Sequence, residues 1–325
     1  LDTYGASDRL LFSESDYRTP SSSKAISALQ DLMCDKDFCT LYSLFMLALA
    51  RKELSACSCR LFIGEKPIPS QTIEDLSTEV TEDELNEAFI DEWGVKYSKD
   101  GRKLLKAPQG LNGNYSVKVG TRIICDDAFS KCSSLTSIVI SNSVPSIGDW
   151  AFSDCTSLSN IVIPNSVTSI GEGAFSSCTS LSDIVIPDSV TRIGNLAFSN
   201  CTSLSNIVIS DSVTNIGDDV FYQCSSLTSI VIPNSVTCVG DEAFCNCRSL
   251  SNIVIPNSVT SIGVSVFWGC SSLVNIDIPD SVTRIGDWAF VNCSNLSYDL
   301  KQELISRFGD ELFKLPLHFP AFLKS

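Results

Sequence analysis

The chain has 325 residues, enough for two ordinary domains or for one domain and a repeat array. Its net charge of −15 argues against a nucleic-acid ligand and against docking on an anionic membrane surface. The longest apolar run, at 41–50, is about half the length of a membrane-spanning helix, so we expect no membrane insertion. No signal peptide is visible at Leu1.

Residues 1–93 predict a small, mostly helical N-terminal domain that fits no family pattern. The stretch from Ser23 to about Glu53 has a helical apolar pattern, and a second helix begins at the capping box of Thr81 and Glu84. The apolar positions of this second helix are Leu85, Ala88, Phe89 and Trp93. Residues 94–120 follow as a strand-rich cap and transition, with a β-hairpin centred on Asp100-Gly101.

Residues 121–298 contain eight copies of one unit with a period of 23 residues. The cysteines that mark the period are Cys132, Cys155, Cys178, Cys201, Cys224, Cys247, Cys270 and Cys293. A Phe lies three residues before each of them and a Leu three residues after. One unit cannot bury its apolar residues alone, so neighbouring units must stack.

A typical unit contains an Ile-Val-Ile strand, a Gly that permits a turn conformation, and usually an acidic residue that caps the short turn leading to Ala-Phe. The first unit departs from this pattern, because Cys125 stands where later units have Gly. We predict an α+β repeat protein in which the units form a right-handed solenoid with a parallel β-sheet. Residues 299–325 are expected to close it as a C-terminal helical cap, since Leu300, Leu304, Phe308 and Leu312 recur at fours in an amphipathic helix over 298–313.

The repeat resembles the BspA-type class of leucine-rich repeats, on the strength of Leu-x-x-Ile-x-Ile-Pro, Val-x-x-Ile-Gly and Ala-Phe-x-x-Cys over about residues 117–298. Members of this class often have a similar Tyr-x-x-Asp-Gly-x-x-Leu hairpin before the first repeat, as in residues 97–104 here. The resemblance implies a surface or secreted binding protein, and several members are regarded as adhesins for host matrix proteins or other cells.

The sequence offers little material for catalysis, and we expect no enzyme activity and no cofactor. His318 is the only His, which excludes any multi-His metal site or His-dependent triad without it; we interpret it as a tail residue near the C-terminal cap. In the N-terminal domain, Cys34, Cys39, Cys57 and Cys59 are interpreted mainly as packed free thiols. A disulfide or a zinc site remains an alternative for these four.

Two ladders within the repeats are interpreted as structural. The eight in-phase cysteines are predicted to be small core residues, with no disulfides between neighbours. The acidic positions Asp149, Glu172, Asp218, Asp241 and Asp287 supply about one carboxylate per coil, too few for calcium, and are assigned to turn capping. No metal site is therefore predicted.

The middle residue of each strand is the best candidate for contact with a partner, because it faces away from the core if the flanking Ile residues face inward. These residues are Val139, Val162, Val185, Val208, Val231 and Val254, and the row ends at Asp277. A polar row that includes Asn160, Asn206 and Asn252 runs beside them. An apolar band rimmed by polar groups is typical of a protein-binding surface, although Val is also simply a good strand former.

A second candidate set consists of residues that break the repeat. Arg192 and Arg284 share one position, and Arg122 lies one residue before that phase; Trp150 and Trp288 share another position, and Trp268 lies just past Phe267. Exposed Trp and Arg side chains commonly anchor interfaces, and Trp near the two ends can instead pack against the caps.

Two functions fit these observations. The first is a non-enzymatic, adhesin-like protein at the cell surface or secreted, which recognises a host, matrix or other protein through the sheet face. The second is a cytoplasmic adaptor or sensor, in which the repeats select an intracellular partner and residues 1–93 dock an effector.

Overall fold

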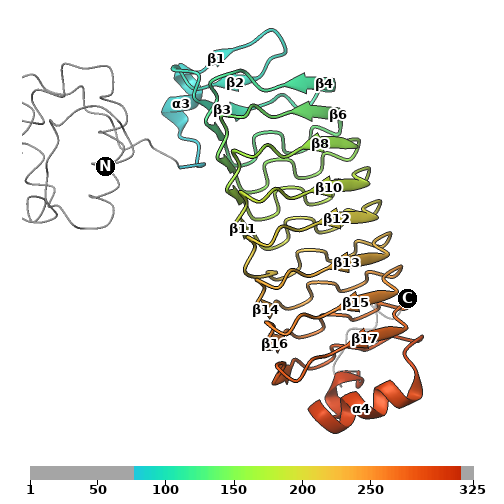
Figure 1. Ribbon diagram of the computed structural model, residues 1–325. Helices are drawn as coiled ribbons and strands as arrows, with labels where there is room; N and C mark the ends of the chain where they lie inside the picture. Colours follow the sequence, from blue (N-terminus) through green and yellow to red (C-terminus); the bar gives the residue numbers. More distant parts are fainter. Residues whose placement is uncertain (1–76, 316–325) are drawn as a thin grey trace, which may run out of the picture. The chain divides into compact units, whose positions relative to one another are not determined.

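The repeats fold as stacked coils, and all but one of them carry a short strand on each of two sides. The computed structural model describes residues 77–315, and the stack runs through them from the blue to the red end in Figure 1. The paired strand residues of the repeats are 23 positions apart, as in the parallel pairs Ile184↔Ile207 and Ile253↔Ile276. The repeat period of the sequence is therefore the pairing register of the structure.

The longer strands form the main ladder. Its members are β4 (Asn112–Ser116), β6 (Ser134–Val139), β8 (Asn160–Val162), β10 (Asp183–Val185), β12 (Asn206–Val208), β13 (Ser229–Val231), β15 (Asn252–Val254) and β17 (Asn275–Asp277). They are hydrogen-bonded as three successive parallel sheets, β4-β6-β8, β10-β12 and β13-β15-β17.

Two-residue strands on another side of the coils form the back ladder. Its members are β5 (Ile123–Ile124), β7 (Ser146–Ile147), β9 (Ser169–Ile170), β11 (Arg192–Ile193), β14 (Cys238–Val239), β16 (Ser261–Ile262) and β18 (Arg284–Ile285). In the coil between β11 and β14, a single parallel bridge, Ile216↔Val239, takes the place of a strand and joins that coil to β14.

A third set of coil-to-coil bonds joins the turns before the cysteines. Trp150, Phe152 and Asp154 donate their backbone N–H groups to the carbonyls of Glu172, Ala174 and Ser176, at 2.7–2.9 Å. Two positions in each coil, such as Trp150 and Asp154, have a positive φ, which turns these N–H groups toward the next coil. The turns thus add backbone bonds between coils where no strand is assigned.

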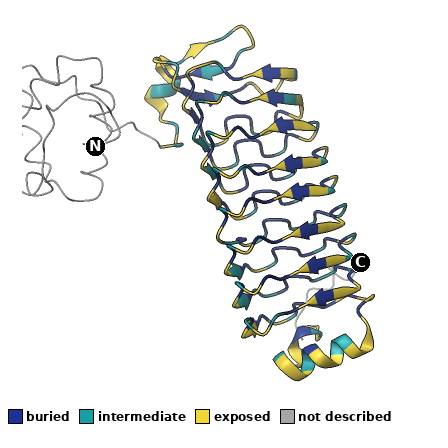
Figure 2. Cartoon of the chain, in the orientation of Figure 1, coloured by how far each residue is buried: buried dark blue, intermediate teal, exposed yellow. Residues whose placement is uncertain are grey.

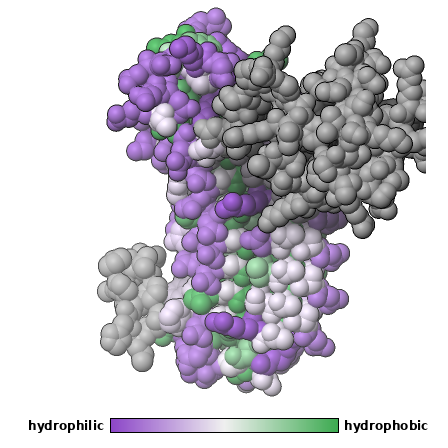
Figure 3. Space-filling model, turned by 90° about the vertical axis from the view of Figure 1, so that its left-hand side faces the viewer, coloured by the Kyte–Doolittle hydropathy of each residue, from purple (hydrophilic) through white to green (hydrophobic). Residues whose placement is uncertain are grey.

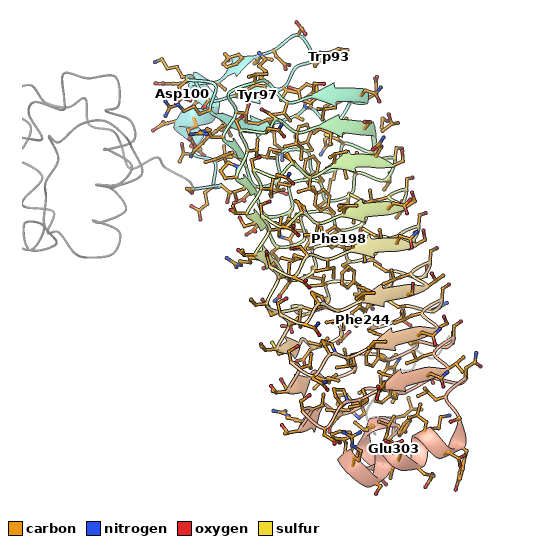
Figure 4. All side chains as sticks on the ribbon, in the orientation of Figure 1. Trp93, Tyr97, Asp100, Phe198, Phe244 and Glu303 are labelled. Atoms are coloured by element: carbon orange, nitrogen blue, oxygen red, sulfur yellow. The ribbon has the colours of Figure 1, made fainter. Side chains whose placement is uncertain are left out.

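The core between the ladders consists of stacked copies of the same side chains. Phe129, Phe152 and their equivalents to Phe290 are buried, with neighbouring ring centroids 5.0–5.8 Å apart. Phe198 and Phe244 show their inward direction in Figure 4. This arrangement confirms the stacked solenoid predicted from the sequence.

The repeat glycine has a different role from the one predicted. None of Gly148, Gly171, Gly194, Gly217, Gly240, Gly263 and Gly286 has a positive φ, so they do not serve a special turn conformation. A Cβ added at Gly171 would instead lie 2.5 Å from the backbone carbonyl carbon of Gly148. Glycine is present because two coils approach too closely there for any side chain. Cys125 is tolerated at this position in the first unit, where the preceding strand is β3 and not another coil.

The N-terminal end of the described part differs from the prediction in one helix. α3 (Glu82–Glu87) begins with the predicted capping box of Thr81 and Glu84 but ends six residues before Trp93. Phe89 belongs to strand β1 (Phe89–Ile90), where its ring stacks on Tyr97 at 5.3 Å. Tertiary pairing therefore overrides the helical apolar pattern at this point.

The hairpin predicted around Asp100-Gly101 is confirmed. β2 (Lys96–Tyr97) and β3 (Lys103–Lys106) are antiparallel, and Gly101 turns with a φ of 73°. β3 then pairs in parallel with β5, and β4 pairs with β6, so this transition supplies the first rung of both ladders. Residues 1–76, with their predicted helix and Cys34, Cys39, Cys57 and Cys59, lie outside the described residues.

The C-terminal end contains α4 (Tyr298–Phe308), followed by a 3₁₀ turn, η3 (Asp310–Leu312). The single helix predicted to reach Phe313 is interrupted at Gly309, which has a φ of 95°. Leu304 and Leu312 are buried, and Leu300 and Phe308 pack partly against the core. Residues 316–325, including His318, lie outside the described part.

Candidate protein-binding face

The strands of the main ladder alternate between a buried Ile and exposed neighbours. The middle valines, which we call the Val stripe, are Val139, Val162, Val185, Val208, Val231 and Val254. Their side chains are 59–77% exposed, whereas the Ile between each Val and its polar neighbour is at most 6% exposed. Figure 2 shows this alternation as yellow and blue along each arrow of the ladder. The exposure of the stripe agrees with the sequence, and its role in binding stays a prediction.

A polar row runs beside the Val stripe on the same face of the strands. Its members are Ser137, Asn160, Asp183, Asn206, Ser229, Asn252 and Asn275. Asn206 donates its Nδ2 to Asp183 Oδ1 of the coil before, at 3.2 Å, and Ser182 Oγ donates to Asp183 Oδ2 at 2.8 Å. The hydrogen bond from Ser182, and to a smaller extent that from Asn206, lowers the pKa of the Asp183 carboxyl. The carboxylate is thus held in place at the surface.

The face formed by the Val stripe and the polar row is nearly uncharged. From Ser137 to Asp277, these two rows contain only Asp183 and Asp277 as charged residues. Asp277 pairs with Val254 at the last rung of the ladder, so it ends the stripe. The face therefore offers β-branched methyl groups and polar amides and hydroxyls to a partner, in a protein whose net charge is −15.

A third row on the turn that follows each strand was missed by sequence reasoning. Only Asn or Asp occupies this exposed position, at Asn142, Asn165, Asp188, Asp211, Asn234, Asn257 and Asp280. We call it the Asx row. The signal that could have revealed it is the restriction to two residue types, at a position that the repeat pattern had treated as variable. Asn and Asp are also favoured in turns for local reasons, so the row adds polar groups near the strand ends without requiring a ligand.

The residues that break the repeat do not form one site. Arg122, Arg192 and Arg284 are exposed, but they belong to the first, fourth and last coils. Trp150 and Trp288 are half-buried and not exposed, contrary to their interpretation as exposed anchors. The ring of Trp150 occupies the space over Gly173, where an added Cβ would lie 2.4 Å from it. This Trp packs against the next coil.

The surface on the side of the back ladder has another character. Figure 3 faces that side and shows hydrophilic atoms predominating on the visible N-terminal end, with paler columns along the coils below. The first residue of each back-ladder strand varies: it is Ser in β7, β9 and β16, Arg in β11 and β18, Cys in β14 and a buried Ile in β5. The back ladder lacks a continuous row of exposed valines among the residues that the structure describes.

Asp149, Asp218 and Asp241 of the acidic ladder link coils instead of capping their own turns. Asp149 Oδ1 accepts the backbone N–H of Glu172 at 2.7 Å, and Asp241 Oδ1 accepts that of Val264 at 2.7 Å. Asn195 performs the same role for Asp218, which explains why Asn can replace an acid there. Within residues 77–315, no group of three or more His, Cys, Asp or Glu side chains is arranged to hold a metal ion.

The cysteine ladder is buried, as predicted for core residues, and its thiols are free in the described part of the chain. Each thiol also donates a hydrogen bond that the sequence did not reveal. Cys201 Sγ donates to Phe175 O at 3.1 Å, and Cys224 Sγ donates to Phe198 O at 3.1 Å. Burial raises the pKa of the Cys132 thiol to about 11 and those of Cys201 and Cys293 to about 12.

These pKa shifts predict that alkali destabilises the protein. Unfolding exposes the thiols and returns each pKa to about 8.5, so the unfolded state loses protons first as the pH rises. The protonated thiols favour the folded state fully below about pH 8.5, and this stability is lost progressively as the pH rises through the folded pKa values near 11 and 12. We expect the urea midpoint, followed by circular dichroism, to be lower at pH 10.5 than at pH 8. In the double variant Cys201→Ala/Cys224→Ala, the difference between the urea midpoints at pH 8 and pH 10.5 should be smaller. Equal midpoints at the two pH values in the wild type would contradict the prediction.

Comparison with known proteins places these features in a family. The model of the BspA-type leucine-rich repeat region matches in six copies, over residues 114–228 and 214–315. The chain belongs to this family. The resemblance inferred from its repeat motif is therefore confirmed, and no curated protein matches the chain.

The chain is similar to solved structures of bacterial leucine-rich repeat proteins, one of which shares its fold. A leucine-rich repeat protein from Eubacterium ventriosum has 24% identity over 72% of this chain and 53% of its own, with a TM-score of 0.51. A leucine-rich cell surface protein from Faecalibacterium prausnitzii has 30% identity over 51% of this chain and 59% of its own, with a TM-score of 0.33. A leucine-rich repeat protein from Bacteroides ovatus has 28% identity over 64% of this chain and 67% of its own, with a TM-score of 0.44. This BspA-type chain thus spans between half and three-fifths of the first two structures.

Proposed function

We propose that this BspA-type protein is a non-enzymatic binding protein that recognises a protein ligand through the Val stripe and the polar row. The observation that carries the proposal is the continuous row of valines, each at least 59% exposed, on a nearly uncharged face. Apolar surface of this kind, rimmed by polar groups, favours contact with another protein over contact with water.

The chemistry of the face also indicates the kind of contact. Its methyl groups recur at the spacing of neighbouring parallel strands, about 4.8 Å, and the polar row follows them at the same spacing. A partner with apolar side chains and backbone or amide hydrogen-bonding groups can meet both rows together. As the family resemblance implies, the setting we propose is the cell surface or the secreted space, with a host or matrix protein as ligand.

The face is tested by charging it. In the double variant Val185→Asp/Val208→Asp, capture of purified matrix proteins immobilised on a biosensor is expected to weaken at least tenfold, because carboxylates would be desolvated in the interface. Arg192→Asp is the matched control: it also changes the net charge by −2, but at an exposed position of the back ladder. Circular dichroism checks that all variants keep the fold.

The outcomes separate the face from the rest of the molecule. If Val185→Lys/Val208→Lys weakens capture as much as Val185→Asp/Val208→Asp does, the loss of apolar contact is the cause. The sign of the introduced charge then has no effect. Unchanged capture in both double variants would eliminate the Val stripe as the site. If only Arg192→Asp weakened capture, the binding site would be assigned to the back ladder instead.

A second candidate, the cytoplasmic adaptor, is favoured by the eleven free cysteines of the described residues. Their burial, however, protects ten of them in either compartment, since only Cys238 is partly exposed. The helices of the described part are too short or too polar to cross a bilayer. A secretion signal or lipid anchor encoded before Leu1 in the full gene would eliminate the adaptor.

A further inference from the structure

Asp183 is the one charged side chain of the polar row. The other members of the row are Ser or Asn, and Asn occupies the same position one coil before and one coil after, at Asn160 and Asn206. Because Asn has the shape of Asp without its charge, the stacking of the coils does not require a carboxylate at this position. The fold therefore leaves the charge of Asp183 unexplained.

The chain holds this carboxylate in place without neutralising it. Its Oδ2 accepts the hydroxyl of Ser182 at 2.8 Å, and its Oδ1 accepts the amide of Asn206 at 3.2 Å. A carboxylate has about four acceptor sites, so about two are left for another donor. The side chain is exposed, and no Lys or Arg of residues 77–315 forms an ion pair with it. Asp183 thus presents a fixed, uncompensated negative charge.

Exposed valines lie beside this charge. Val185 follows two residues later in β10, so it projects from the same side of the strand, about 6.6 Å further along. Val208 pairs with Val185 in the next coil, and the two side chains are 59% and 62% exposed. The next charge within the two rows is Asp277, four coils or about 19 Å away, which is well beyond the screening length of about 8 Å at physiological salt. The site therefore combines one carboxylate with a small apolar surface.

An arginine side chain has the matching chemistry. Its guanidinium can donate two parallel N–H bonds to a carboxylate, and its aliphatic stem can lie on apolar surface while the charged head reaches a polar group. We propose that Asp183 binds an arginine of the protein ligand, with the stem of that arginine packed on Val185 and Val208. The net charge of −15 favours the approach of such a basic segment. This inference rests on the proposed function, since it names the partner chemistry of the same face.

Two short peptides test the site with the full chain. Acetyl-Val-Arg-Val-amide is titrated in, and the methyl signals of Val185 and Val208 are followed by nuclear magnetic resonance. These signals should shift, and the Kd should be about fivefold larger for acetyl-Val-citrulline-Val-amide, which has nearly the same shape without the charge. Asp183→Asn should raise the Kd of the arginine peptide by the same factor and reduce its increase with salt.

The matched control is Asp188→Asn, which removes an equal charge from an exposed position five residues later in the same coil. It should leave the Kd of the arginine peptide unchanged. Asp183→Asn introduces the residue that the neighbouring coils already have, so circular dichroism should show the fold retained. Equal Kd values for the two peptides, or for wild type and Asp183→Asn, would overturn the inference. An equal loss in Asp188→Asn would do so too, because the overall charge would then be the cause.

Capture of matrix proteins separates this inference from the proposed function. If Val185→Asp/Val208→Asp weakens capture and Asp183→Asn leaves both capture and peptide binding unchanged, the face is retained and the role of Asp183 is refuted. If the arginine peptide binds as expected and no matrix protein is captured, the role of Asp183 is supported and the matrix ligand is refuted.

Discussion

Replacing Gly194 by Ala is expected to lower the free energy of unfolding by at least about 3 kcal/mol, at the upper end of the usual cost of overpacking. An added Cβ would lie 2.5 Å from the backbone nitrogen of Glu172 and 2.6 Å from the carbonyl carbon of Gly171. Both atoms belong to the backbone of the preceding coil, so no side-chain rotation relieves the contact. The coils must separate, which weakens the ladders on both sides of the site.

Urea unfolding followed by circular dichroism measures this effect, with Gly110→Ala as the control. A Cβ at Gly110 meets no heavy atom within 4 Å, and Gly110 has no positive φ. Its substitution should therefore leave the urea midpoint nearly unchanged. Similar midpoints for the two variants would refute close coil approach as the reason for the repeat glycine.

The Phe ladder predicts the second large effect. Phe198→Ala is expected to lower the free energy of unfolding by about 4 kcal/mol, within the usual range for a buried Phe. The Phe198 ring is fully buried and stacks between Phe175 and Phe221, at centroid distances of 5.4 and 5.8 Å. Its removal leaves a cavity among coils whose backbones are held by strand pairing, as in β10–β12 and β9–β11, and by the turn bonds.

The same urea measurement compares Phe198→Ala with Val208→Ala. Val208 is 59% exposed, so its truncation should change the free energy of unfolding by no more than about 0.5 kcal/mol. Because each coil contacts only its neighbours, deuterium exchange should increase first in the coils that contain Phe175, Phe198 and Phe221. A uniform increase along the whole stack would contradict this local weakening.

The sequence was sufficient to predict the solenoid because every coil has the same neighbours. One repeat unit, found eight times in the sequence, was enough to predict three features. These are the period of 23, the burial of the Phe, Leu and Cys positions, and the alternation of Ile and Val. The alternation also predicted the exposure of the Val stripe, since side chains on a strand point to opposite faces in turn. The capping box at Thr81 and the hairpin at Gly101 were predictable because their signals are local.

Only the tertiary structure decided what each side chain contacts in the next coil. The repeat glycine faces the backbone of the preceding coil, the acid of Asp149 binds the N–H of Glu172, and the Cys201 thiol binds the carbonyl of Phe175. Phe89 leaves the predicted helix to stack on Tyr97. These contacts join residues 8 to 26 positions apart, and the type of a residue and its nearest neighbours do not specify which group lies across such a gap. Periodicity therefore fixes where each coil lies, and the close approach of the coils decides which atoms meet.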